Sequence, residues 1–257
     1  MKKISIEESK KLLPYLRKEK DYNVFIIGDI ENISSENEYI DIYLDGTIDN
    51  PRGVLLRYFD YFVIYTDDVT DYKAAAKIIM NHNKSKSLNG KVNVIKRMKP
   101  YLQKLIKKEE SYSFLVLKDL NYCDSDYEIK KVTADSTGKV IEFLKTIEEF
   151  ENIDERFFVS DIKNQTARCY FIEKDSKVVS TASSTAESSV GAIIADVATA
   201  KEYRDRGYAK AIVIKLCSDL LKEGKTPYIL YDNPSAGKLY ESIGFKKIGS
   251  WKILRFE

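Results

Sequence analysis

The chain has 257 residues, enough for one large domain or two smaller ones at ~150 residues per domain. Its 42 basic and 40 acidic residues leave a net charge of +2, which disfavours nucleic acid as the main partner. With 44% hydrophobic and 32% charged residues, the composition excludes a disordered chain and a membrane-embedded one. The chain is expected to be a soluble globular protein.

The cysteines and the N-terminal segment indicate a reducing compartment. Cys123, Cys169 and Cys217 are widely spaced and odd in number, so they predict neither a disulfide framework nor a zinc knuckle. We expect no metal. The first twenty residues carry charges throughout, unlike a signal peptide, and the longest apolar run, residues 54–65, is too short to cross a bilayer. The sequence therefore predicts a cytoplasmic protein with no membrane partner.

The first half of the chain predicts two helices, an antiparallel meander of three strands, and then alternating helices and strands. Apolar residues at near-helical spacing mark the helices, and turn-forming residues separate the strands. The predicted helices cover residues 5–20, 22–30, 71–80 and 100–107, and the predicted strands cover 38–44, 53–58, 61–65, 91–95 and 112–117.

A polar stretch at residues 121–126 lacks apolar periodicity and predicts the boundary between two domains, residues 1–123 and 124–257. Beyond it, the predicted strands cover residues 127–132, 169–173, 178–184, 192–199, 228–231 and 245 onward, and the predicted helices cover 136–150, 156–167, 207–221 and 234–243. This order nearly repeats that of the first half. We therefore expect two lobes of one fold.

The segment after the strand at residues 192–199 predicts a phosphate-binding turn. A helix N-terminus has N–H groups without intrahelical partners and a partial positive charge, so an anion can bind at residues 206–210. Gly207 removes the side chain that would keep a phosphate away. Four cations at positions 201, 204, 206 and 210 outnumber two acidic residues. The alternative is an ordinary strand-to-helix turn with a solvated basic rim.

The later helix has well-marked limits. Asn233 suits an N-cap, Pro234 the first helical residue, and Gly244 a left-handed C-terminal residue. Asn233 and Tyr240 are seven residues apart, close to two helical turns. An amide and a phenol are therefore expected on one face of this helix.

These two segments resemble the motifs of the GNAT superfamily of acyl-CoA-dependent N-acyltransferases. The run Arg204-Asp-Arg-Gly207-Tyr-Ala209 resembles its Q/R-x-x-G-x-G/A signature, and Asn233, Ala236, Tyr240 and Gly244-Phe245 resemble its later N-x-x-A-x-x-x-Y-x-x-x-G-F segment. The resemblance covers residues 127–257. It implies an α+β GNAT fold, with a mixed central sheet flanked by helices, in two tandem lobes.

The resemblance also implies a cofactor site for acetyl-CoA as cosubstrate. The pyrophosphate would bind backbone amides of the turn, and the pantetheine arm would follow the preceding strand. The implied cofactor-binding residues are Val197, Ala198, Thr199, Arg204, Arg206, Gly207, Tyr208, Ala209, Lys210, Asn233 and Ala236. The corresponding turn of the first lobe, residues 65–73, has three aspartates and no glycine, so that lobe is expected to be a degenerate copy that does not bind CoA.

Two residues are candidates for proton transfer. The resemblance implies that the Tyr240 hydroxyl protonates the departing thiolate, whereas simple packing is the alternative in a chain with 18 tyrosines. Asp196 is the only ionisable residue in the strand segment 192–198, and burial would raise its pKa towards that of a useful base. Its alternative roles are a structural carboxylate paired with a cation, or a residue that shapes the substrate site.

The sequence thus predicts an N-acetyltransferase that transfers an acetyl group to a primary amine by direct attack. A small-molecule acceptor is favoured because a second lobe tends to enclose one side of the acceptor site. The alternatives are a protein or peptide N-acetyltransferase and a non-catalytic acyl-CoA-binding sensor. The lack of an obvious base favours the sensor, whereas Asn233 and Tyr240 argue against it. The sequence does not predict the oligomeric state or the acyl-chain preference.

Overall fold

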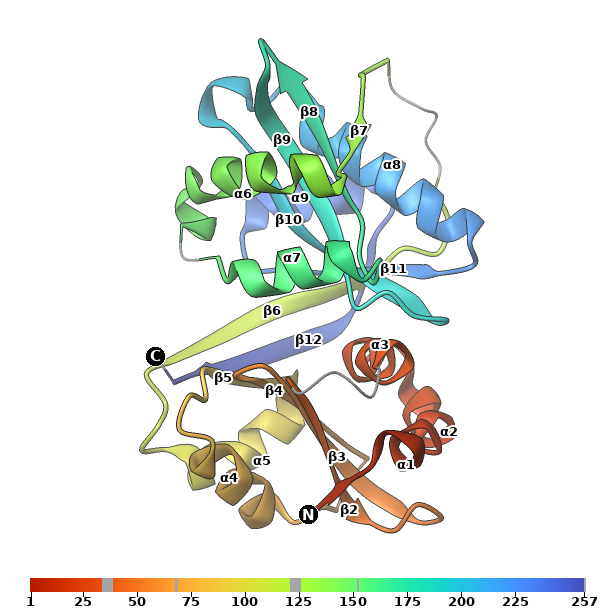
Figure 1. The fold of residues 1–257 in the computed structure, drawn as a ribbon, viewed down its shortest axis with the longest axis vertical. Coiled ribbons are helices and arrows are strands. Elements are labelled where there is room, and N and C mark those ends of the chain that lie inside the picture. The colour runs from red at the N-terminus through yellow and green to blue at the C-terminus, as the bar shows by residue number, and fades with distance from the viewer. Residues whose placement is uncertain (34–38, 68, 121–125, 152, 257) are drawn as a thin grey trace. The chain divides into compact units, whose positions relative to one another are not determined.

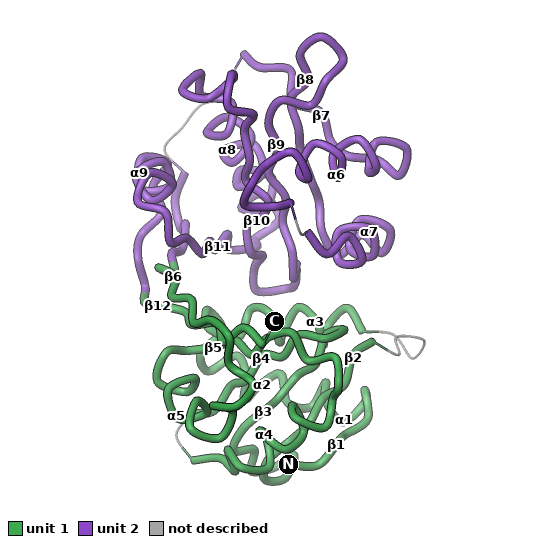
Figure 2. The backbone as a smooth tube through the Cα atoms, turned by 90° about the vertical axis from the view of Figure 1, so that its left-hand side faces the viewer, with its two compact units in different colours: residues 1–114, 249–257 green, residues 115–248 purple. Residues whose placement is uncertain are grey.

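A computed structural model describes residues 1–33, 39–67, 69–120, 126–151 and 153–256. The chain forms two compact units (Figure 2), one of residues 1–114 with 249–257 and the other of residues 115–248. The predicted domain boundary near residue 123 falls on 121–125, outside the described residues, and stays a prediction. Both units combine helices with a mixed sheet (Figure 1), which confirms the predicted α+β class.

The first unit is built on the sheet order β1-β2-β3-β4-β5, with β12 beside β5. Its strands pair antiparallel except β4 and β5, which are parallel. Its elements are β1 (Lys2–Ile4), α1 (Ile6–Lys10), α2 (Leu13–Leu16), α3 (Val24–Asn32), β2 (Ile40–Gly46), β3 (Pro51–Tyr58), β4 (Tyr61–Thr66), α4 (Tyr72–Asn81), β5 (Ser87–Lys91), α5 (Val92–Leu102) and most of β6 (Lys108–Val116).

Two predicted elements of this unit are wrong. Residues 92–95 were expected to continue a strand, but they begin α5. The helix expected over 100–107 contains only the end of α5, which stops at Leu102, and residues 103–107 form a turn before β6. Buried Val94, Ile95, Met98 and Leu102 recur at helical spacing and pack into the core. The β-branched residues at the start of α5 concealed this period. The helix expected over 5–20 is also divided, and Pro14 stands in the first turn of its second part, α2.

The second unit follows the predicted order of its elements. Those elements are β7 (Lys130–Lys131), α6 (Thr137–Lys145), α7 (Glu155–Lys163), β8 (Cys169–Lys174), β9 (Lys177–Thr185), β10 (Gly191–Thr199), α8 (Tyr208–Lys222), β11 (Thr226–Tyr231), α9 (Pro234–Ile243) and the start of β12 (Lys246–Arg255). The strand order is β7-β8-β9-β10-β11, with β6 beside β11. Of the four strand pairings described between β7 and β11, only that of β10 with β11 is parallel.

Helices cover both faces of this second sheet because its strands are apolar on both sides. Along β8, Cys169 and Phe171 belong to the core beneath α6 and α7. The alternate residues, Tyr170 and Ile172, belong to the core beneath α8 and α9. Successive strand residues point to opposite faces, so one strand serves two cores.

The last strand of each half does not stay with the elements that precede it. β12 pairs antiparallel with β5 of the first unit, from Trp251 opposite Lys91 to Arg255 opposite Ser87. Conversely, the chain after β6 joins the second unit, where the N–H of Leu117 donates to the carbonyl of Pro227 at 2.9 Å. Each unit is therefore completed by chain from the other half.

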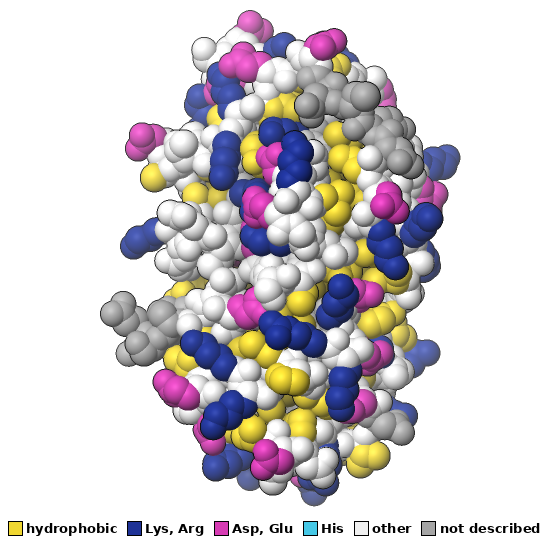
Figure 3. All heavy atoms as spheres, turned by 90° about the vertical axis from the view of Figure 1, so that its right-hand side faces the viewer, with side chains coloured by type: hydrophobic (Ala, Val, Ile, Leu, Met, Phe, Trp, Pro, Cys, Tyr) yellow, Lys and Arg dark blue, Asp and Glu magenta, His cyan; other side chains and the backbone are white. Residues whose placement is uncertain are grey.

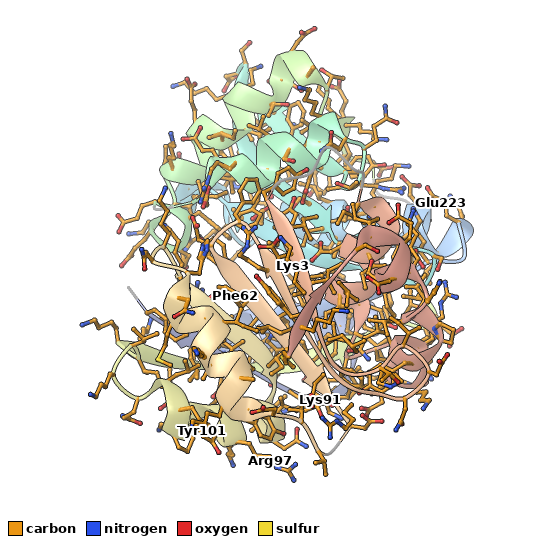
Figure 4. All side chains as sticks on the ribbon, turned by 60° about the horizontal axis from the view of Figure 1, so that its bottom comes forward. Lys3, Phe62, Lys91, Arg97, Tyr101 and Glu223 are labelled. Atoms are coloured by element: carbon orange, nitrogen blue, oxygen red, sulfur yellow. The ribbon has the colours of Figure 1, made fainter. Side chains whose placement is uncertain are left out.

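An ion cluster fixes the end of α8 in the second unit. The guanidinium of Arg168 lies 2.7 Å from a carboxylate oxygen of Glu187 and 2.6 Å from one of Glu223, which is labelled in Figure 4. Lys225 lies 2.9 Å from Glu187. The Arg168 guanidinium lowers the pKa of Glu223 to about 2. Burial opposes ionisation of Glu187, but Arg168, Ser184 and Lys225 together hold its pKa below the usual value.

No helix within the described ranges is long and apolar enough to span a bilayer. On the molecular face drawn in Figure 3, basic and acidic side chains are interspersed.

Candidate functional site

The parallel strands β10 and β11 separate at one end. They pair only from Gly191–Ile194 against Thr226–Ile229, although β10 continues to Thr199 and β11 to Tyr231. On its other side, β10 pairs with β9 through a register shift between Ala195 and Ala198. A strand that leaves its neighbour presents main-chain donors and acceptors that another molecule can pair with. The predicted cofactor residues Val197–Thr199 lie in this separated segment.

Hydroxyl groups hold the separated end of β10 in place. Ser180 Oγ donates to the carbonyl of Ala198 at 2.9 Å and lies 2.8 Å from Thr199 Oγ1. Arg204 Nε donates to the carbonyl of Thr199 at 3.2 Å. Its guanidinium therefore points towards the end of β10, the segment predicted from the sequence to bind the cofactor.

The predicted phosphate turn leads into α8 without a side-chain cap. Gly207 is the N-cap, with φ +81°, and its carbonyl accepts the N–H of Ala211 at 2.9 Å. The N–H groups of Tyr208 and Ala209 precede this first intrahelical bond, as in any helix N-terminus. A Cβ on Gly207 would meet no described atom closer than the Tyr127 hydroxyl, at 3.9 Å. The turn is open to an anion.

Tyr127 stabilises this turn, a role that no sequence pattern indicated. Its hydroxyl donates to the carbonyl of Arg206 at 2.6 Å, and its ring lies 4.9 Å from that of Tyr208. Tyr208 is buried, so its side chain packs while its N–H remains at the helix start. The guanidinium of Arg206 donates to the carbonyl of Glu202 at 3.0 Å and lies 5.2 Å from the Tyr203 ring centre. Lys210 follows in the first helical turn.

The limits of α9 are those predicted. Asn233 Oδ1 accepts the N–H of Ser235 at 2.9 Å, so the amide caps its own helix, and the helix ends at Gly244. Gly237 allows a close approach, because a Cβ there would lie 2.5 Å from the ring of Tyr231. Ala236 packs against the core beneath α8 and α9.

Tyr240 combines a packed ring with an unbonded hydroxyl. It is 6% exposed, and its ring centre lies 5.9 Å from that of Tyr231 and 6.0 Å from that of Phe245. Among the described residues, none forms a hydrogen bond with its hydroxyl. Burial raises the pKa of Tyr240, so the phenol stays protonated at neutral pH and can donate a proton.

Asp196 lies within the register shift of β10 and has a positive φ of +49°. The Ser183 hydroxyl donates to one of its carboxylate oxygens. Burial is the main factor that raises the pKa of Asp196, and the neighbouring Asp161 raises it further, while the Ser183 hydrogen bond opposes both. No lysine or arginine among the described residues forms an ion pair with Asp196, so the structural ion-pair alternative has no support.

Three residues near Asp196 were not predicted: Asp161 on α7, and Ser183 and Thr185 on β9. Thr185 Oγ1 donates to Asp161 Oδ2 at 3.1 Å. The sequence carried a signal for the hydroxyls, because the buried strand β9 contains a run of serines and threonines, and buried polar groups need partners. Nothing in the sequence pointed to Asp161.

A GNAT acetyltransferase family model matches residues 24–254. A GCN5-related N-acetyltransferase-like protein from Streptococcus suis aligns over 98% of this chain and 100% of its own, with 15% identity and a TM-score of 0.65. A Drosophila protein aligns over 98% and 97%, with 12% identity and a TM-score of 0.69. A tandem GNAT protein from the clavulanic acid biosynthesis pathway aligns over 100% and 98%, with 11% identity and a TM-score of 0.62.

No curated protein sequence matches the chain significantly. At these identities the solved structures establish the fold, which the tandem GNAT protein shares along its length. The family model covers most of the chain, including both motifs of the second unit. The chain therefore belongs to the GNAT acetyltransferase family.

Proposed function

We propose that this protein is an N-acetyltransferase that transfers an acetyl group from acetyl-CoA to the primary amine of a small molecule. The observation that carries the proposal is the separated end of β10, where Asp196 directly precedes the cofactor segment Val197–Thr199. A base candidate and main-chain groups for the cofactor thus lie on consecutive residues. A small acceptor is favoured over an extended peptide because Asp196 is only half-buried, whereas Ser183 beside it is 2% exposed.

Several features of the second unit support a binding site for acetyl-CoA. Its pyrophosphate would bind the N–H groups at the start of α8, with Arg204 and Arg206 nearby, and Gly207 leaves the space. Val197–Thr199 would pair with the pantetheine arm, and the start of α9, with Asn233 and Ala236, would support it. When bound, acetyl-CoA supplies a thioester that an amine can attack.

Two residues would move protons. Asp196 would take a proton from the acceptor ammonium, which frees the nitrogen lone pair to form the C–N bond. Its raised pKa makes it a stronger base than an ordinary aspartate. As the C–S bond breaks, Tyr240 would donate its hydroxyl proton to sulfur, and the second proton that leaves the acylated nitrogen would return the phenolate to the phenol. Positioned proton transfer contributes roughly 10²–10⁴-fold to a rate.

The substitution Tyr240→Phe tests the proposal because it removes the hydroxyl and keeps the ring contacts with Tyr231 and Phe245. We expect turnover to fall roughly 10²–10⁴-fold while CoA affinity is unchanged. Release of free thiol from acetyl-CoA, measured against a panel of amines and peptides, gives turnover, and calorimetry gives CoA affinity. Unchanged turnover would exclude Tyr240 as the acid. Activity on peptides alone would indicate a protein acetyltransferase, and CoA binding without activity on any acceptor would indicate a sensor.

A further inference from the structure

Two carboxylates of the second unit are held side by side by one strand. Ser183 and Thr185 are two residues apart on β9, so their side chains share a face, ~7 Å apart along the strand. Ser183 donates to Asp196 of β10, and Thr185 donates to Asp161 of α7 at 3.1 Å. Neighbouring hydroxyls thus bind carboxylates from two different elements.

The register shift of β10 gives Asp196 its direction. Ala195 lies opposite Ser183, and the next pair is Ala198 opposite Thr181, so β10 contains one more residue than β9 between the two pairs. An extra residue of this kind re-aims the side chains around it. Asp196 also has a positive φ, which a residue with a side chain retains only where its surroundings hold it. The Ser183 hydrogen bond supplies such a contact.

The groups that face Asp196 differ in charge. Asp161 on α7 is acidic, and Ser183 on β9 presents a hydroxyl; Thr181, the next inward residue of β9 that carries a hydroxyl, contacts Cys169. Cys169 on β8 lies 3.1 Å from Thr181 Oγ1, and burial, followed by the charge of Asp196, raises the pKa of its thiol, so that it stays neutral. None of these four residues brings a positive charge to Asp196.

We propose that Ser183 and Asp161 are positioning residues for Asp196: Ser183 fixes the direction of its carboxyl, and Asp161 places a second negative charge beside it. The inference rests on the proposed function, in which Asp196 is the base. The two residues act on the base in opposite senses. A hydrogen bond to the ionised carboxylate favours ionisation, whereas a neighbouring negative charge favours protonation.

Because Ser183 and Asp161 should shift the ionisation of Asp196 in opposite directions, they can be tested without measuring turnover. The full-length protein carrying ¹³C-labelled aspartate is titrated by NMR, and Asp196→Asn assigns the Asp196 carboxyl signal. We expect Asp161→Asn to move the Asp196 midpoint to lower pH and Ser183→Ala to move it to higher pH. Asp161→Glu keeps the charge and should leave the midpoint near that of the unchanged protein.

Asp219→Asn is the matched control, because Asp219 binds Tyr170 and Lys215 on the other face of the sheet. It should leave the Asp196 midpoint unchanged. Midpoints that move in the same direction for Asp161→Asn and Ser183→Ala, or not at all in folded protein, would overturn the inference. Denaturant unfolding verifies that each variant is folded.

The pH dependence of kcat/KM separates this inference from the proposed function. If Asp196 is the base, the acidic limb of the profile should move in the same directions as the NMR midpoints. Midpoints that move while the limb stays fixed would support the positioning roles and overturn the base role of Asp196. Fixed midpoints would overturn the positioning roles whatever the activity.

Discussion

Helices α4 and α8 occupy corresponding places in the two units, but their N-termini are satisfied in opposite ways. Each follows a strand that pairs in parallel with its neighbour over four residues and then continues beyond it. At the start of α4, the side chain of Asp71 accepts the N–H of Ala74 at 2.9 Å, and Asp45 accepts the N–H of Asp71 at 3.0 Å. At the start of α8, Gly207 offers no side chain.

The difference teaches how the same kind of strand-to-helix turn can cap its helix N-terminus or leave it available for the proposed anion. In the first unit, the carboxylates of Asp71 and Asp45 occupy the N–H groups that an anion would need, and they add negative charge. Two residues after the last paired residue stands Thr66, whose hydroxyl donates to the carbonyl of Arg52 at 2.9 Å. The corresponding position in the second unit is Asp196. The first unit caps the N–H groups at the start of α4 with its own carboxylates, whereas no described side chain caps those at the start of α8.

Asp196→Thr, which gives β10 the residue found in β4, should have the largest effect. Without its carboxylate, the second unit loses the proposed base, and kcat should fall roughly 10²–10⁴-fold while CoA affinity stays the same. Steady-state thiol release and calorimetry measure the two quantities. Thr66→Val in the first unit is the control and should leave kcat unchanged. A loss of less than tenfold for Asp196→Thr would show that another group takes the proton.

Gly207→Asp tests whether a carboxylate alone closes the site, as Asp71 does in α4. Unit charges ~4 Å apart repel by about 4 kcal/mol at an effective dielectric of ~20, and solvent reduces this value at an exposed turn. We expect CoA to bind roughly a hundredfold more weakly, measured by calorimetry. Gly207→Ala is the control for backbone strain, since φ is +81° there. Equal losses in the two variants would mean that strain, and not charge, weakens binding.

The parts of the site that could be predicted are those governed by local chemistry. Short-range signals mark both helices: a glycine precedes α8, and α9 starts with Asn-Pro and stops at a glycine. These helices begin and end within one residue of the predicted limits. The residues around Asp196 come from three elements, so their proximity depends on tertiary pairing. Asp161 and Ser183 come near Asp196 because β9 contacts both α7 and the register shift of β10.

The arrangement of the last strands could not be predicted for a related reason. Both β6 and β12 have the composition of ordinary strands, and nothing local states which neighbour each one pairs with. The pairing of Trp251 with Lys91 joins residues 160 positions apart in the sequence. For helix α5 the local signal itself misled, because its β-branched residues suggested a strand. The residues form a helix because Val94, Met98 and Leu102 recur at helical spacing and are buried together.

Asp71→Ala and Asn233→Ala compare two N-caps, one in each unit. Each removes a side chain that accepts a helix N–H, and each should lower the free energy of unfolding by about 1 kcal/mol, measured with urea. Only Asn233→Ala should also weaken CoA binding, because Asn233 lies in the proposed cofactor site. Weaker CoA binding by Asp71→Ala would contradict the closed state of the first unit.

The C-terminal ends of the same two helices are held differently, and acid should weaken the ion cluster after α8. The resulting loss of unfolding free energy is the smallest of the predicted effects. Beyond α4, His82 Nε2 lies 3.1 Å from Asp60, whereas α8 leads to Glu223 in its ion cluster with Arg168. Arg168 lowers the pKa of Glu223 from 4.5 to about 2, so the stabilisation is complete above pH ~4.5 and is lost as the pH falls towards 2.

Because the Glu223 side chain is 44% exposed, solvent limits this stabilisation to less than about 1 kcal/mol. The unfolding free energy of Glu223→Gln should therefore lie slightly below that of the unchanged protein at pH 6, and the two values should converge near pH 2. Urea unfolding across this range measures both. Glu148→Gln, on the exposed turn after α6, is the control and should have the unfolding free energy of the unchanged protein at pH 6. A difference for Glu223→Gln that persists at pH 2 would place its origin in packing, because the protonated carboxyl no longer forms the ion pair.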